Sequence, residues 1–134
     1  MPTRSSRTGD LTNRLELPAM HEETVQIESS KGKRGQLILR VIGPLDITTE
    51  VKFRELVRAA GVDRVVILDL CAVQRCDSTG LGALITVMKA FDVEGRRLAL
   101  TGLNARLQLL FEIMQVKAFF TVFESTAEAE ETFV

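Results

Sequence analysis

Residues that commonly bind metals are scarce in this sequence, which has two cysteines and one histidine. Cys71 and Cys76 are too few to form a zinc site, and His21 lies far from both in the sequence. The spacing of the two cysteines also differs from the C-x-x-C motif of redox proteins, and Cys71 ends an apolar run. We therefore expect no metal site, and we interpret Cys71 as a small buried hydrophobic residue whose thiol stays reduced.

Charge of one sign and long apolar runs are also missing. The 17 basic and 18 acidic residues give a net charge of −1 at pH 7, so no overall field attracts nucleic acid or an anionic membrane. No apolar run approaches the roughly 18 residues of a membrane span, and the N-terminal segment lacks the apolar core of a signal peptide. We expect a soluble, cytoplasmic protein with no direct nucleic-acid or membrane partner.

The common catalytic motifs are absent as well. The sequence contains no G-x-x-x-x-G-K-[ST] phosphate loop, no G-x-S-x-G nucleophile elbow and no H-E-x-x-H helix. An enzyme built on Asp46, Asp77 and Ser78 is an alternative, but it would lack a histidine base, a metal site and a cofactor loop. We therefore predict that the protein is not an enzyme and needs no cofactor, which a screen for turnover would check.

What is present is the composition of one ordinary globular domain. The chain has 134 residues, of which 46% are apolar and 26% charged, enough to bury a core without disulfides or metal. Residues 1–20 are polar and lack hydrophobic periodicity, so we predict a flexible tail before a domain at 21–134. The apolar run at 65–70 is interrupted only by Asp69, which predicts a strand in the middle of a sheet.

Periodicity and turn residues predict alternating strands and helices along this domain. In chain order we expect strands at 24–28 and 36–42 joined as a hairpin, a helix capped by Thr48 or Thr49 and closed by Gly61, the strand at 65–70, a helix from Ser78 to Gly95, a strand at 97–101, a helix capped by Asn104, a weak strand at 118–123 and a helix capped by Ser125. The apolar stripes of the three main helices contain Phe53, Leu56, Val57 and Ala60, then Leu81, Leu84, Ile85, Met88 and Phe91, and finally Leu107, Leu110, Phe111 and Met114. This order predicts an α/β fold, with a mixed sheet of four to five strands and about four helices in a single domain.

One segment combines features of a functional site. Residues 76–82 read Cys-Asp-Ser-Thr-Gly-Leu-Gly and lie where the buried strand is followed by an amphipathic helix, whose unpaired first N–H groups favour an anion such as phosphate. Gly80 and Gly82 each cost about 1 kcal/mol of helix propensity relative to alanine, and close approach by a partner would explain them. Alternatively, Asp77 or Ser78 is merely the N-cap and the glycines let the helix pack tightly on the sheet.

A family resemblance favours the functional interpretation. Residues 77–84, with sequence DSTGLGAL, resemble the D-S-[ST]-G-[LV]-G signature of STAS domains, and they follow a VVILDL strand as in that family. Upstream, residues 43–49, with sequence GPLDITT, resemble the G-x-[LI]-D entry into the first helix of the family. The similarity covers about residues 22–134 and is greatest to bacterial anti-sigma factor antagonists. It implies a STAS-like sheet and no catalysis.

The resemblance also implies a mechanism. Antagonists of this kind bind an anti-sigma factor serine kinase and thereby free a sigma factor for RNA polymerase. The serine that this kinase phosphorylates follows the motif aspartate and corresponds to Ser78, whereas Thr79 is the less favoured acceptor. The phosphate would prevent binding, and a phosphatase would restore it. The implied contact residues are Asp46, Asp77, Ser78, Thr79, Gly80, Leu81 and Gly82. The alternative is a STAS subunit of a stressosome or of a lipid-transport ABC assembly.

Overall fold

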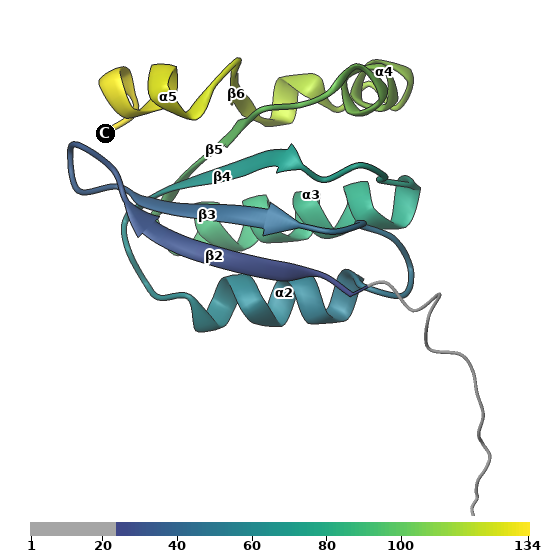
Figure 1. Ribbon diagram of the computed structural model, residues 1–134, viewed down its shortest axis with the longest axis horizontal. Helices are drawn as coiled ribbons and strands as arrows, with labels where there is room; N and C mark the ends of the chain where they lie inside the picture. Colours follow the sequence, from purple (N-terminus) through teal and green to yellow (C-terminus); the bar gives the residue numbers. More distant parts are fainter. Residues whose placement is uncertain (1–23) are drawn as a thin grey trace, which may run out of the picture.

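The computed structural model describes residues 24–134, so the predicted tail at 1–20 and His21 lie outside the described residues. The described elements, numbered as in Figure 1, follow the predicted alternation of strands and helices. They are β2 (Gln26–Lys31), β3 (Leu37–Ile42), α2 (Glu50–Ala59), β4 (Val65–Ala72), α3 (Ser78–Val93), β5 (Arg97–Thr101), α4 (Ala105–Ile113), the short 3-10 helix η2 (Lys117–Phe119), β6 (Thr121–Phe123) and α5 (Thr126–Thr132).

Five strands form one mixed sheet in the order β2-β3-β4-β5-β6. β2 pairs with β3 in antiparallel register, which confirms the predicted hairpin. The later strands pair in parallel, as expected for strands that are joined by helical crossovers. β4 occupies the centre of the sheet and its residues 66–68 and Leu70 are buried, so the prediction of a central strand made from its apolar run is confirmed.

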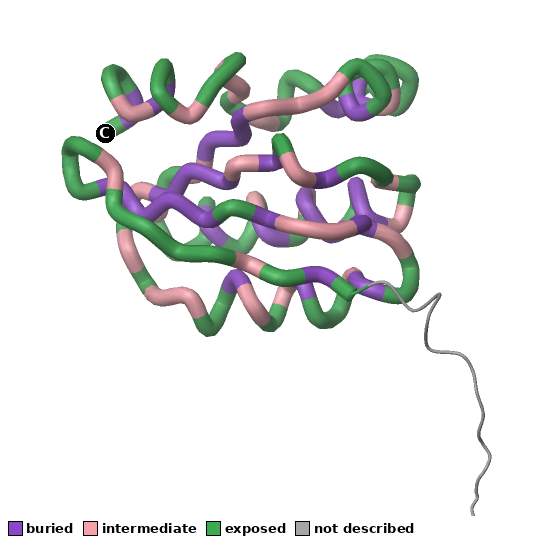
Figure 2. Tube along the Cα trace, in the orientation of Figure 1, coloured by how far each residue is buried: buried purple, intermediate pink, exposed green. Residues whose placement is uncertain are grey.

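The two faces of the sheet carry different helices (Figures 1 and 2). Side chains alternate along a strand, so Leu68 of β4 faces the larger core while its neighbour Ile67 faces the opposite side. The larger core also contains Phe53, Leu84 and Phe111 from α2, α3 and α4, which therefore cover one face. On the other face, the smaller core contains Ile38, Ile67, Ala99, Ala129 and Phe133, so α5 covers that side.

A buried glutamine attaches α5 to the first hairpin. Gln36 is only 2% exposed, and its side-chain amide donates hydrogen bonds to the carbonyl oxygens of Glu130 (3.0 Å) and Phe133 (2.9 Å). Its Oε1 accepts a hydrogen bond from the backbone N–H of Arg34 at 3.1 Å. The amide is thus fully used, which makes its burial tolerable and holds the end of α5 against the start of β3.

Several local predictions were wrong. α4 ends at Ile113, so Met114 lies beyond the buried stripe and is 46% exposed. The strand predicted at 118–123 begins only at Thr121, because η2 occupies 117–119. Cys71 is exposed rather than buried: it shares a face with Asp69. The predicted N-cap of α2 is confirmed at Thr49, although its side chain makes no capping hydrogen bond.

Among residues 24–134, no helix combines the length and the apolar character that a bilayer crossing requires.

Candidate functional site

The candidate site lies at the start of α3, where its sequence builds a well-formed N-terminus. Asp77 is the N-cap residue, with an extended backbone, and its carboxylate accepts a hydrogen bond from the N–H of Gly80 at 2.9 Å. This arrangement confirms one of the two predicted capping residues. Ser78 is the first residue of the helix and is exposed, so its hydroxyl is accessible to another molecule.

A second segment of the chain is fixed beside this helix end. Leu45, in the loop between β3 and α2, pairs with Cys76 as an isolated parallel bridge. The Leu45 N–H donates to the carbonyl of Arg75 at 2.9 Å, and the Leu45 carbonyl accepts from the N–H of Asp77 at 3.2 Å. The two motifs of the sequence therefore form one site, with Asp46 held next to the start of α3.

The two glycines of the motif have different surroundings. A Cβ atom added at Gly80 would lie 2.0 Å from the carbonyl oxygen of Leu45, closer than atoms in real proteins approach. Gly80 therefore permits a close contact, as the structural interpretation expected, but the contact is with the loop between β3 and α2 rather than with the sheet. A Cβ at Gly82 would meet nothing within 4 Å, and Gly82 is exposed. The fold itself gives no reason for glycine there.

The carboxylate of Asp46 is held by its own loop. Its Oδ1 accepts hydrogen bonds from the Thr48 backbone N–H (2.9 Å) and hydroxyl (2.6 Å), and the Thr48 hydroxyl contributes most to keeping the Asp46 pKa below its usual value. Arg75 lies 3.6 Å from Oδ2 and acts in the same direction. The buried Thr49 hydroxyl donates to the Pro44 carbonyl at 2.8 Å and accepts from the Asp46 N–H at 3.0 Å, which fixes the loop backbone.

The thiol of Cys76 lies between these acidic groups. Burial, followed by the negative charges of Asp77 and Asp46, raises its pKa to about 12. A thiol with such a pKa is almost entirely protonated at neutral pH and is a poor nucleophile. Both cysteines are free in the structure. Cys76 is therefore a structural residue of the site rather than a reactive one.

The predicted contact residues differ in accessibility. Asp77, Ser78 and Gly82 are exposed, whereas Asp46 and Thr79 are half-buried. Leu81 is 1% exposed and belongs to the main core, and Gly80 is buried against Leu45. These two residues support the site from the interior of the protein and are not accessible to a partner. Ser78 and Gly82 are four residues apart and therefore lie on one face of α3, where both small residues are exposed to solvent.

Two exposed apolar residues between the Asp46 loop and the first turn of α2 were not predicted from the sequence. Ile47 and Val51 are 71% and 54% exposed, and they lie one turn apart around the start of α2. Ile47 directly follows Asp46 and has a polar residue on each side of it in the sequence. Single exposed apolar side chains are common on protein surfaces, so the sequence offered no distinct signal for this pair.

The arrangement offers an exposed hydroxyl at a helix N-terminus, two neighbouring carboxylates and an exposed apolar pair. Within residues 24–134, no cluster of three or more histidine, cysteine, aspartate or glutamate side chains could hold a metal ion. The helix end favours a negatively charged group by about 0.3–1 kcal/mol, so the fold itself would tolerate a phosphate on Ser78. The chemistry of the site suits modification and recognition.

Comparison with known proteins identifies the class of domain. Residues 26–129, which include the whole sheet and the start of α3, match the model of the STAS domain family. The chain belongs to the STAS domain family, as the residues of its two motifs predicted.

Curated relatives are regulatory proteins. The chain is 33% identical over 91 residues to the anti-sigma-B factor antagonist of Listeria monocytogenes, a match that covers 66% of this chain and 80% of the relative. It is 32% identical over 90 residues to the protein of the same name from Staphylococcus aureus, with 66% and 83% of the two chains covered. These relatives place the chain among homologues of anti-sigma factor antagonists.

Solved structures share the fold. An anti-sigma factor antagonist from Mycobacterium paratuberculosis superposes with a TM-score of 0.65 at 16% identity, covering 78% of this chain and 90% of that one. The antagonist SpoIIAA in its unphosphorylated form gives a TM-score of 0.61 at 18% identity, covering 77% and 90%. The predicted STAS-like sheet with its helices is therefore confirmed.

Proposed function

We propose that this protein is an anti-sigma factor antagonist that binds an anti-sigma factor serine kinase and releases a sigma factor, and that phosphorylation of Ser78 switches it off. The observation that carries the proposal is the exposed hydroxyl of Ser78 at the first position of α3, directly after the capping Asp77. The names of the curated relatives support the same role. The protein acts as a binding module in the cytoplasm and catalyses no reaction of its own.

Ser78 rather than Thr79 is the acceptor in this proposal. A kinase must bring the γ-phosphate of ATP into line with the acceptor oxygen, which requires open space around the hydroxyl. Ser78 is exposed, whereas Thr79 is half-buried. The same requirement means that the kinase surface must lie over the start of α3.

The unmodified surface suits close contact with a partner. Gly82 lies one turn after Ser78 and leaves open space where a side chain would otherwise stand. Ile47, which directly follows Asp46, and Val51 provide exposed apolar area, and removal of such area from water stabilises a complex. Binding therefore needs no rearrangement of the loop that contains Asp46, because the backbone of that loop is already held by hydrogen bonds.

A phosphate on Ser78 would oppose this contact. It adds a charge of about −1.5 to −2 and three oxygen atoms on the residue directly after Asp77, beside the loop that contains Asp46. Burying that charge against a partner costs free energy unless the partner provides matching cations. A phosphatase acting on Ser78 would restore binding. The fold stays intact in both states, so the switch acts at the interface.

The proposal is tested by incubating the purified protein with a candidate anti-sigma factor kinase and Mg-ATP. Mass spectrometry should find one phosphate, located on the peptide that contains Ser78, and Ser78→Ala should abolish it. Ser30→Ala, which removes an exposed serine of β2, is the matched control and should leave phosphorylation unchanged. Phosphate on other residues with Ser78 unmodified would contradict the proposal.

A further inference from the structure

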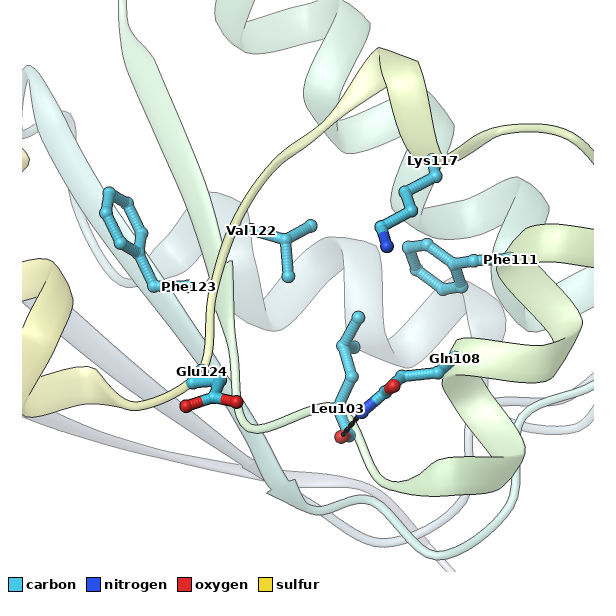
Figure 3. A pocket seen from close by; sticks show the side chains of 7 residues that line it. All are labelled: Leu103, Gln108, Phe111, Lys117, Val122, Phe123 and Glu124. Atoms are coloured by element: carbon cyan, nitrogen blue, oxygen red, sulfur yellow. Dashed lines mark hydrogen bonds between the residues drawn. The ribbon is translucent and has the colours of Figure 1, made fainter.

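A cavity of about 290 Å³ lies between α4 and β6, and none of the residues that line it belongs to α3 (Figure 3). Its walls are apolar where Leu103, Phe111 and Val122 meet. Polar groups lie around them on Gln108, Lys117 and Glu124. Its volume is close to the lower end of the 300–1,000 Å³ range typical of small-molecule sites.

The place of this cavity in the sheet is one where α/β proteins bind ligands. The chain leaves β5 toward α4, which packs on the same face as α2 and α3, whereas it leaves β6 toward α5 on the opposite face. Connections that diverge in this way open a crevice outside the carboxyl ends of the two strands. Leu103 follows β5 and Glu124 follows β6, so the cavity includes that crevice, and it extends along β6 to Lys117, which precedes the strand.

The polar groups indicate the chemistry of a ligand. Figure 3 shows the ammonium group of Lys117 between the ring of Phe111 and the side chain of Val122. Among residues 24–134, neither Lys117 nor Glu124 has an ion-pair partner. Glu124 lies at the opposite end of the cavity lining from Lys117. The Gln108 amide donates to the Leu103 carbonyl at 2.9 Å, which leaves its oxygen as an acceptor.

We propose that this cavity binds a small amphipathic carboxylate. Its carboxylate pairs with the Lys117 ammonium, its apolar body packs on Phe111 and Val122, and a hydroxyl or amino group at its far end donates to Gln108 or Glu124. A molecule with one aromatic ring and a short chain matches the volume. The site shares no residue with the surface around Ser78, so its existence is independent of the proposed function.

The test uses the full chain labelled with nitrogen-15 and 3-(4-hydroxyphenyl)propanoate as the probe. Titration should give saturable amide shifts centred on the residues between α4 and α5, with a dissociation constant in the millimolar range or below. The neutral amide of the same probe should bind at least tenfold more weakly, because it cannot pair with Lys117. Shifts that do not saturate, or that centre elsewhere, would overturn the proposal.

Variants separate the charge from the cavity. Lys117→Gln should weaken carboxylate binding about tenfold or more while leaving the neutral amide unaffected, and Lys117→Arg should retain binding. Lys89→Gln, which removes an exposed lysine of α3, is the matched control and should change neither affinity. Val122→Phe should fill the space and abolish binding of both probes, with an unchanged spectrum elsewhere as evidence of folding. Equal carboxylate affinity of Lys117→Gln and the unmodified protein would overturn the assignment.

Discussion

The backbone of Gly80 passes so close to Leu45 that a Cβ atom at position 80 would lie 2.0 Å from the Leu45 carbonyl oxygen. That oxygen also accepts the hydrogen bond from Asp77, so it cannot move away without breaking the bridge between the two motifs. Gly80→Ala should therefore destabilise the protein by about 3 kcal/mol, or prevent stable folding altogether. Urea denaturation followed by circular dichroism measures the change.

Gly82→Ala is the matched control, because it makes the same chemical change two residues further along the helix. The added methyl group meets nothing within 4 Å, and alanine has a higher helix propensity than glycine. We expect a gain in the free energy of unfolding of about 0.5–1 kcal/mol. If both variants lost the same stability, glycine would be required at the start of α3 for a reason other than the contact with Leu45.

Substitution of Ser78 should separate the effect of charge from that of packing. Ser78→Ala should bind a candidate anti-sigma factor kinase within a few-fold of the unmodified protein, because a methyl group fits where a small exposed residue packs. Ser78→Asp places a negative charge beside Asp77 at the contact and should cost about 3 kcal/mol, or roughly a hundredfold in affinity. Calorimetric titration makes the comparison, and equal affinity of all three proteins would contradict the interface switch.

Thr48→Ala should raise the pKa of Asp46, because the Thr48 hydroxyl contributes most to lowering it below 3.8. A carboxylate with a lowered folded-state pKa stabilises the fold above its unfolded-state pKa and loses that contribution as the pH falls. The free energy of unfolding of the unmodified protein should thus exceed that of Thr48→Ala by about 1 kcal/mol at pH 7. This difference in stability should shrink below pH 3.8. Carboxyl NMR titration measures the pKa; an unchanged value would show that other groups hold the charge.

Cys76 should resist alkylation in the folded protein. Its pKa of about 12, against an ordinary value of 9.0, lowers the thiolate fraction at pH 8 about a thousandfold. Iodoacetamide should therefore modify Cys76 at least a hundredfold more slowly in the native protein than in urea. The exposed Cys71 of the same molecule should react first and reports that the reagent is active. Equal rates at both cysteines would contradict this assignment.

Much of the fold could be predicted because its signals are local. The hairpin, the buried β4 and the helix following it were evident from alternation, an apolar run and helical spacing. Asp77 was identified as one of two capping candidates because aspartate before an apolar stripe satisfies unpaired N–H groups. The association of Asp46 with Ser78, by contrast, came from the family resemblance, since nothing local predicts which loops meet.

Features that depend on tertiary contacts could not be predicted in this way. Cys71 continues an apolar run, yet its exposure depends on which face it shares and on what covers that face. Gly80 and Gly82 are indistinguishable in sequence, and only the path of the Leu45 loop makes one of them necessary. The cavity beside Lys117 arises where two helices diverge to opposite faces, which requires the positions of both.

The hydrogen bonds from Gln36 to the end of α5 join residues as many as 97 positions apart in the chain. On the ribosome, the hairpin that contains Gln36 emerges early, whereas the helix that satisfies its amide is synthesised late. Until then, Ile38, Ile67 and Ala99 remain without the cover of Ala129 and Phe133. One face of the sheet in the nascent protein therefore stays uncovered until α5 has been made, so its apolar residues are accessible to other molecules up to that point.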